Sequence, residues 1–188
     1  DRNQKYQTSE GFRSRYFLDL PVISETATLQ NTYIFKYYTD LFENNISTAS
    51  IYLSSSTSLK DENVKLSERI IIPSNRLRGF QRGKVGPKDG NDFIGGNYAG
   101  AINFTSTIPQ ILENSENIDF LVFFDAGNVW GVDYFDGDDE GSEIRSSTGV
   151  ALDWLTPIGP LNFTLAMPIT KSDNDKTETF RFNLGTSF

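Results

Sequence analysis

Large apolar residues alternate with small or polar residues along much of this chain. The alternation is clearest near the end, where Phe180, Phe182 and Leu184 are separated by Arg181 and Asn183. A period of two indicates a strand, because successive side chains of a strand point to opposite faces of the sheet. The same pattern recurs in the segments 28–38, 96–105, 147–154 and 159–167. The sequence therefore predicts an all-β protein.

About eight such segments divide the chain, and no stretch with helical periodicity separates them. Their predicted ranges are 11–20, 26–38, 47–56, 96–108, 119–130, 146–156, 160–169 and 178–188. Strands without helical connections are expected to pair antiparallel through hairpins. The connectors around Pro21, 114–117 and 157–160 are short, whereas 57–95 and 131–145 are long. We therefore expect short turns at one end of the strands and long loops at the other.

The two faces of the predicted sheet favour a membrane barrel over a soluble β-sandwich. Strands of a sandwich point their large residues inward and carry Lys, Glu and Thr outside. Here the face opposite the aromatic residues is rich in Gly, Ala, Ser and Asn, as expected of a lumen packed with protein. Outer-membrane strands need about 9 to 11 residues to cross the bilayer, which matches these segments. The soluble sandwich is the alternative on pattern alone.

Composition limits the chemistry that the chain can perform. Its 188 residues include no Cys and no His, so a thiolate nucleophile, a disulfide and the commonest general base are absent. Neither a Gly-x-Ser-x-Gly motif nor a phosphate-binding loop occurs. We therefore expect no enzymatic activity and no cofactor. The chain begins at Asp1 without a leader, and we expect it to be a mature or excised piece.

The longest connector contains a concentration of positive charge. Residues 76–87 read RLRGFQRGKVGP and hold three arginines and a lysine, although the formal net charge of the chain is −8. That acidic balance argues against a nucleic-acid partner. Connectors as long as 57–95 are usually functional or disordered. Regular glycines and Pro87 favour a folded excursion, because they permit and stiffen tight backbone turns.

An arginine inside a barrel requires a partner of opposite charge. The guanidinium of Arg78 stays protonated and carries five donors in a fixed fork. Asp125 is the best partner in the sequence: its neighbours Val122 and Phe124 belong to the lipid-facing set, which turns Asp125 toward the lumen. We predict that this pair latches the loop 57–95 inside the barrel. The alternative is that Arg-Gly-Phe forms a solvated surface turn.

Five motifs in this order resemble the BamA-like family of outer-membrane assembly barrels. They are the Arg-Gly-Phe loop with Val85–Lys88, then Gly95–Asn97, Phe124–Trp130, Thr156–Phe163 and a terminal strand ending in an aromatic residue. The resemblance covers essentially all 188 residues. It implies a transmembrane antiparallel β-barrel of sixteen strands in the bacterial outer membrane, with this chain, residues 1–188, supplying the carboxy-terminal eight. It also implies POTRA domains upstream.

The family pattern carries over to particular residues of the loop. By this resemblance Arg78, Gly79 and Phe80 form the latch with Asp125. Relatives place a second inward-facing glutamate where this sequence has Thr105, so a three-member charge cluster is not expected, whereas the two-member latch is retained.

The last strand is the second functional element that the resemblance implies. A lateral gate would form there, with Gly185 as the point of bending and Phe188 as the terminal aromatic residue, because glycine weakens a strand and permits a kink. The implied function is insertion of β-barrel proteins into the outer membrane. The implied partners are unfolded outer-membrane proteins, outer-membrane lipids and, through upstream domains, the lipoproteins of an assembly complex; nucleic acid is not among them.

Two related functions remain open at this stage. One is a polypeptide-translocating barrel of the two-partner secretion or TamA-like kind, and the other is a barrel that anchors an upstream phospholipase domain. The motifs Val85–Lys88 and Gly159–Phe163 favour assembly. The acidic stretch Asp133–Glu143 is rich in oxygen ligands, but its spacing does not fit an EF-hand, and we expect a solvated loop without metal.

Overall fold

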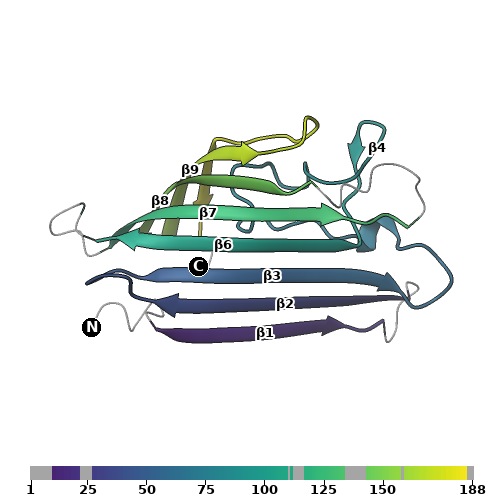
Figure 1. Cartoon of the computed structure of the whole chain (residues 1–188), viewed down its shortest axis with the longest axis horizontal. Helices are drawn as coiled ribbons and strands as arrows, with labels where there is room; N and C mark the ends of the chain where they lie inside the picture. The colour runs from purple at the N-terminus through teal and green to yellow at the C-terminus, as the bar shows by residue number, and fades with distance from the viewer. Residues whose placement is uncertain are drawn as a thin grey trace.

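The computed structural model describes residues 10–21, 27–109, 111, 117–133, 143–157 and 159–185. These residues form one eight-stranded antiparallel sheet in the order β1-β2-β3-β6-β7-β8-β9-β10 (Figure 1). The strands are β1 (Gly11–Asp19), β2 (Thr28–Thr39), β3 (Ser47–Ser58), β6 (Tyr98–Ile108), β7 (Ile118–Trp130), β8 (Arg145–Thr156), β9 (Gly159–Thr170) and β10 (Phe180–Leu184). The predicted all-β antiparallel fold is confirmed, and each strand lies within a few residues of its predicted range.

The connector between β3 and β6 has structure of its own. It contains a 3₁₀ turn, Leu66–Glu68, and a small hairpin of β4 (Lys88–Asp89) and β5 (Asp92–Phe93). Isolated main-chain bonds close it back on itself, since the amide of Ile70 donates to Gly96 O and the amide of Gly96 donates to Ile70 O. The connector is therefore a folded excursion, as its glycine pattern predicted.

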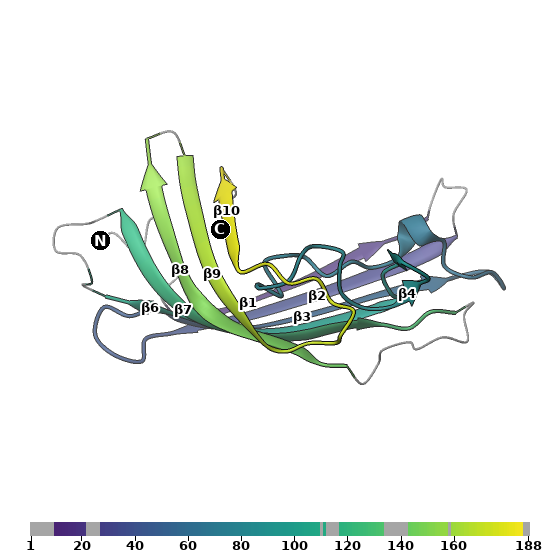
Figure 2. The same ribbon diagram turned by 90° about the horizontal axis from the view of Figure 1, so that it is seen from above.

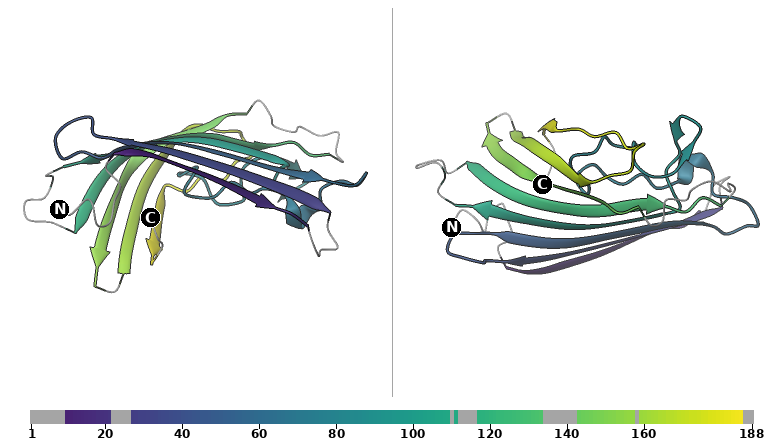
Figure 3. Two further views of the ribbon diagram at one scale, coloured as in Figure 1. Left: turned by 90° about the horizontal axis from the view of Figure 1, so that it is seen from below. Right: turned by 45° about the horizontal axis from the view of Figure 1, so that its top comes forward.

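The sheet is curved, and the connector lies against its concave side (Figures 2 and 3). The opposite face carries exposed apolar side chains on every long strand. Examples are Ile51, Leu53, Ile102, Phe104, Val122, Phe124, Val150, Leu165, Met167, Phe180, Phe182 and Leu184. Small or polar residues that alternate with them, such as Ala99, Ala101 and Asn103, are buried beneath the connector. The large side chains therefore point away from the loop, as the membrane-barrel interpretation requires.

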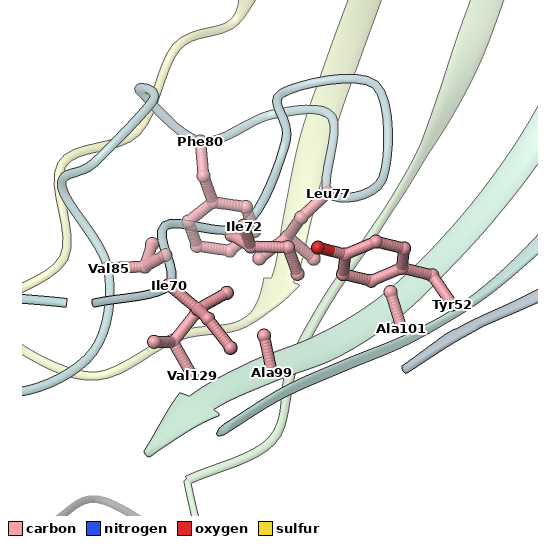
Figure 4. Close-up of a cluster of buried hydrophobic side chains, with 9 residues drawn as sticks. All are labelled: Tyr52, Ile70, Ile72, Leu77, Phe80, Val85, Ala99, Ala101 and Val129. Atoms are coloured by element: carbon pink, nitrogen blue, oxygen red, sulfur yellow. The ribbon is translucent and has the colours of Figure 1, made fainter. Parts of the chain in front are cut away.

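The main hydrophobic cluster lies between the connector and the sheet rather than between two sheets. Loop residues Ile70, Ile72, Leu77, Phe80 and Val85 pack against Tyr52, Ala99, Ala101 and Val129 of the strands (Figure 4). Each buried Leu or Phe side chain contributes about 1.5 to 3 kcal/mol relative to the exposed state. The loop is thus attached to the sheet by apolar packing.

One expectation about the connectors is wrong. Antiparallel alternation places the connectors 20–27, 59–97, 131–144 and 171–179 at one end of the strands. The short connector with Pro21 therefore shares an end with the long loops, and length does not separate the two ends cleanly. In the described part of the chain, no helix is long and apolar enough to cross a membrane.

Candidate functional site

Arg78 and Asp125 form a bidentate ion pair beneath the loop. Nε of Arg78 donates to Oδ2 of Asp125 at 2.8 Å, and Nη2 donates to Oδ1 at 2.7 Å. The backbone amide of Arg78 also donates to Oδ2, at 3.0 Å. The Asp125 side chain is fully buried, and the Arg78 side chain is 16% exposed. Because the two parallel bonds and the amide bond converge on one carboxylate, both the side chain and the backbone of Arg78 are fixed at this point.

Polar groups of β6 complete the surroundings of the pair. Asn103 lies directly across from Asp125 in the β6–β7 register, and its Nδ2 donates to Oδ1 of Asp125 at 2.9 Å and to the carbonyl of Arg76 at 2.7 Å. Thr105 Oγ1 accepts a hydrogen bond from Nη2 of Arg78 at 3.3 Å. A neutral hydroxyl therefore occupies the position where the resemblance would place a second acidic residue.

The guanidinium of Arg78 also stacks on an aromatic ring. Its central carbon lies 3.7 Å from the centre of the Phe123 ring, and Phe123 is buried. A cation over a ring face is stabilised by the negative face of the π-system, more strongly when water is excluded. Phe123 lies two positions before Asp125 on the same strand, so it shares the concave face. That spacing was available in the sequence, but the contact was not predicted.

Gly79 and Phe80 have separate structural roles next to Arg78. Gly79 has a φ of +87°, and a Cβ added there would lie 3.2 Å from Cβ of Ala166 and 3.3 Å from Cβ of Ser147. Glycine therefore suits both the backbone conformation and the close approach to β8 and β9. Ser147 Oγ donates to the carbonyl of Arg78 at 2.5 Å. Phe80, only 2% exposed, inserts into the hydrophobic cluster between the loop and the sheet shown in Figure 4.

Arg76 brings a second cation near the same carboxylate. Its Nη1 donates to Ser50 Oγ at 3.1 Å, and its guanidinium lies over the ring of Tyr52. Burial lowers the pKa of Arg76, and attraction to Tyr52 and Asp125 opposes that effect. The usual pKa of arginine lies so far above neutrality that Arg76 stays charged. Arg76 and Arg78 thus both contact the strands of the concave face, whereas Arg82 and Lys84 are exposed.

A second buried ion pair was missed by the sequence analysis. Nε and Nη2 of Arg145, at the start of β8, donate to Oδ2 and Oδ1 of Asp175 at 2.9 and 3.0 Å. Asn128 Oδ1 accepts from Nη1 of Arg145 at 2.5 Å, and neither side chain of the pair is more than 1% exposed. No periodic pattern marks Asp175, which lies in the connector between β9 and β10. The pair fixes that connector to β8.

The predicted gate residues lie at the end of the described sheet. β10 pairs with β9 over five residues, from Phe180 to Leu184. Gly185 follows with a φ of +72°, and its amide donates to the carbonyl of Pro160 at 2.8 Å. Among the described residues other than its chain neighbours, no atom lies within 4 Å of an added Cβ. Phe188 lies outside the described residues. The gate stays a prediction.

An antiparallel sheet with an exposed apolar face and a charged loop locked on its other side is the arrangement of an outer-membrane β-barrel. The chain belongs to the Omp85 superfamily, because the family model described as the Omp85 superfamily domain matches residues 1–188. The resemblance drawn from the five motifs is thereby confirmed.

Individual relatives agree with this membership. The chain is 29% identical over 139 residues to the outer membrane protein assembly factor BamA of Neisseria meningitidis, covering 60% of this chain and 17% of the relative. It is 29% identical over 117 residues to BamA of Neorickettsia risticii, covering 61% and 16%. A SAM50-like protein of Schizosaccharomyces pombe is 30% identical over 139 residues, covering 70% and 29%. The chain thus spans less than a third of each of these relatives.

A solved structure supports the same assignment. The crystal structure of BamA from Haemophilus ducreyi lacking POTRA domains 1–3 superposes with a TM-score of 0.80 and 29% sequence identity. The match covers 92% of this chain and 38% of that chain. The predicted location in the bacterial outer membrane agrees with the names of the two bacterial assembly factors and with the family.

Proposed function

We propose that this chain is the carboxy-terminal part of a barrel that inserts β-barrel proteins into the outer membrane. The observation that carries the proposal is the basic loop held on the concave face by Arg78 and Asp125, within a chain of the Omp85 superfamily. The relatives named as assembly factors favour this function over the translocation and phospholipase-anchor alternatives. In the whole protein, the eight strands would complete a sixteen-stranded barrel preceded by POTRA domains.

The mechanism that we propose uses backbone pairing rather than covalent chemistry. β10 is an edge strand of the described sheet, and its pairing with β9 is short. An unpaired strand edge is unfavourable in hydrocarbon, because its N–H and C=O groups have no water to bind. A loosened seam beside β10 would therefore favour pairing with an incoming strand of a substrate. Gly185 would let the end of β10 bend away from the seam.

The loop would keep the lumen in a fixed shape while the seam opens. Breaking a buried ion pair by removing one partner typically costs about 3 to 5 kcal/mol, since the other charge is left without compensation. The Arg78–Asp125 pair would therefore resist displacement of the loop during insertion. The partners of this activity would be unfolded outer-membrane proteins, outer-membrane lipids and the lipoproteins of an assembly complex.

A locked seam tests this proposal. A cysteine at Gly185 and a second on the first strand of the whole barrel would form a disulfide across the gate, and residues 1–188 contain no other cysteine. We expect the oxidised double variant to lose insertion of a substrate barrel into liposomes, and the reduced form to recover it. Each single-cysteine variant serves as control. Full insertion activity with the seam crosslinked would reject the lateral gate.

A further inference from the structure

Arg181, in β10, contacts the loop between β3 and β6 with its side chain. Its Nη1 donates to the carbonyl of Ser74 at 2.9 Å, and its Nη2 donates to the carbonyl of Phe80 at 2.8 Å. Its Nε donates to Glu178 Oε2 at 2.7 Å, so a carboxylate holds the guanidinium in place. The Arg181 side chain is 16% exposed. One side chain of β10 thus binds both sides of the turn that carries the Arg-Gly-Phe motif.

The segment that leads into β10 is paired with the loop as well. The amide of Glu178 donates to the carbonyl of Gly79, and the amide of Gln81 donates to the carbonyl of Lys176, each at 2.9 Å. The amide of Lys176 donates to the carbonyl of Lys84 at 3.1 Å. The loop therefore acts as a backbone partner for residues 176–178, just before β10 joins β9.

The connector between β9 and β10 is fixed at its other side. Asp175 is held by the buried ion pair with Arg145, and its Oδ2 also accepts the amide of Ser172 at 2.7 Å. The loop is held independently by Arg78. β10 thus begins from a connector that is bound to β8 on one side and to the loop on the other. The side chain of Arg181 adds a contact between β10 itself and the loop.

We propose that Arg181 is a positioning residue that couples the latched loop to the last strand, so that the placement of the loop determines how firmly β10 is held. This coupling differs from the latch, which joins the loop to β7, and from the gate, which concerns the free edge of β10. Charge-assisted hydrogen bonds are about twice as strong as neutral ones, so the hydrogen bonds of Arg181 hold β10 more strongly than an ordinary pair of main-chain bonds in the short β9–β10 ladder. The coupling itself does not depend on the proposed function, whereas its consequence for insertion does.

Hydrogen exchange of the whole protein in lipid nanodiscs tests the coupling. In Arg181→Ala, we expect amides of residues 180–185 to exchange about tenfold faster or more, as loss of a charged hydrogen bond implies, while residues 76–80 stay protected by the latch. In Arg78→Ala, we expect faster exchange in both segments. Arg82→Ala is the matched control, because Arg82 is an exposed arginine of the same loop, and it should leave residues 180–185 unchanged.

The conservative variant separates fork geometry from charge. Lysine keeps the charge but lacks the planar fork that binds two carbonyls, so Arg181→Lys should show an intermediate rate in residues 180–185. This variant also serves if Arg181→Ala fails to show the heat-dependent gel migration of a folded barrel. The proposal would be overturned if residues 180–185 exchanged at the wild-type rate in the folded Arg181→Ala or Arg181→Lys variant. It would also be overturned if Arg78→Ala accelerated exchange in the loop alone. Because exchange is read without substrate, its failure is distinguishable from failure of the proposed function.

Discussion

Replacing Arg78 with alanine removes the charge that compensates Asp125. The carboxylate would keep its hydrogen bonds from the Arg78 amide and from Asn103, and Arg76 would stay nearby, but the bidentate ion pair with its fully buried oxygens would be lost. Removing one partner of a buried pair costs about 3 to 5 kcal/mol, and the partial exposure of Arg78 favours the lower figure. A cost of about 3 kcal/mol raises the population of the released loop about a hundredfold.

Limited proteolysis measures that population when opening and closing are faster than cleavage. Trypsin sites at Arg82 and Lys84 lie in the same loop, so we expect their cleavage to accelerate about a hundredfold in Arg78→Ala. Lys60→Ala, which removes an exposed positive charge near the start of the loop, is the matched control and should leave the rate unchanged. Arg78→Lys should be intermediate, because an ammonium group makes neither the bidentate pair nor the stack on Phe123. Unchanged cleavage in Arg78→Ala would refute the latch.

Two further substitutions have effects that follow from the structure. Arg145→Ala leaves the buried Asp175 without its charge partner, so it should destabilise the connector between β9 and β10 by about 3 to 5 kcal/mol. We expect a lower midpoint temperature of heat-dependent gel migration. An unchanged midpoint would contradict this. Phe80→Ala should lower the stability of the docked loop by about 3 to 5 kcal/mol, because it leaves a cavity in the hydrophobic cluster between the loop and the sheet, and it should accelerate tryptic cleavage of the loop. Phe93 is a partly buried residue of the small hairpin, so Phe93→Ala should have a weaker effect. Equal cleavage rates in the two variants would show that the cluster does not hold the loop.

The alternation of apolar and polar residues was sufficient to predict the strands and to suggest one ion pair. Alternation assigns Phe124 and Asp125 to opposite faces, and an inward acid in the motif Phe124–Trp130 was the best candidate partner for the loop arginine. The contact between Asn103 and Asp125 could also have been predicted, because the antiparallel register places the two residues opposite one another.

Contacts between a strand and an irregular connector were not predictable in this way. Arg145 and Asp175 are thirty residues apart, and Arg181 binds carbonyls of Ser74 and Phe80 more than a hundred residues away. Neither contact leaves a periodic trace, because in each an arginine of a strand binds a segment without regular structure. The error at Pro21 has a similar origin, since connector length alone does not reveal the end of the sheet at which a connector lies.

The orientation of the apolar face is the central claim, and lipid quenching of single fluorophores measures it directly. The absence of cysteine lets one introduced Cys carry the label, and Leu53 and Ser54 are adjacent on β3 with Leu53 exposed on the apolar face and Ser54 on the other. In bilayers with brominated acyl chains, the account predicts strong quenching of the label at position 53 and weak quenching at position 54. Equal quenching at both positions, or stronger quenching at 54, would contradict it.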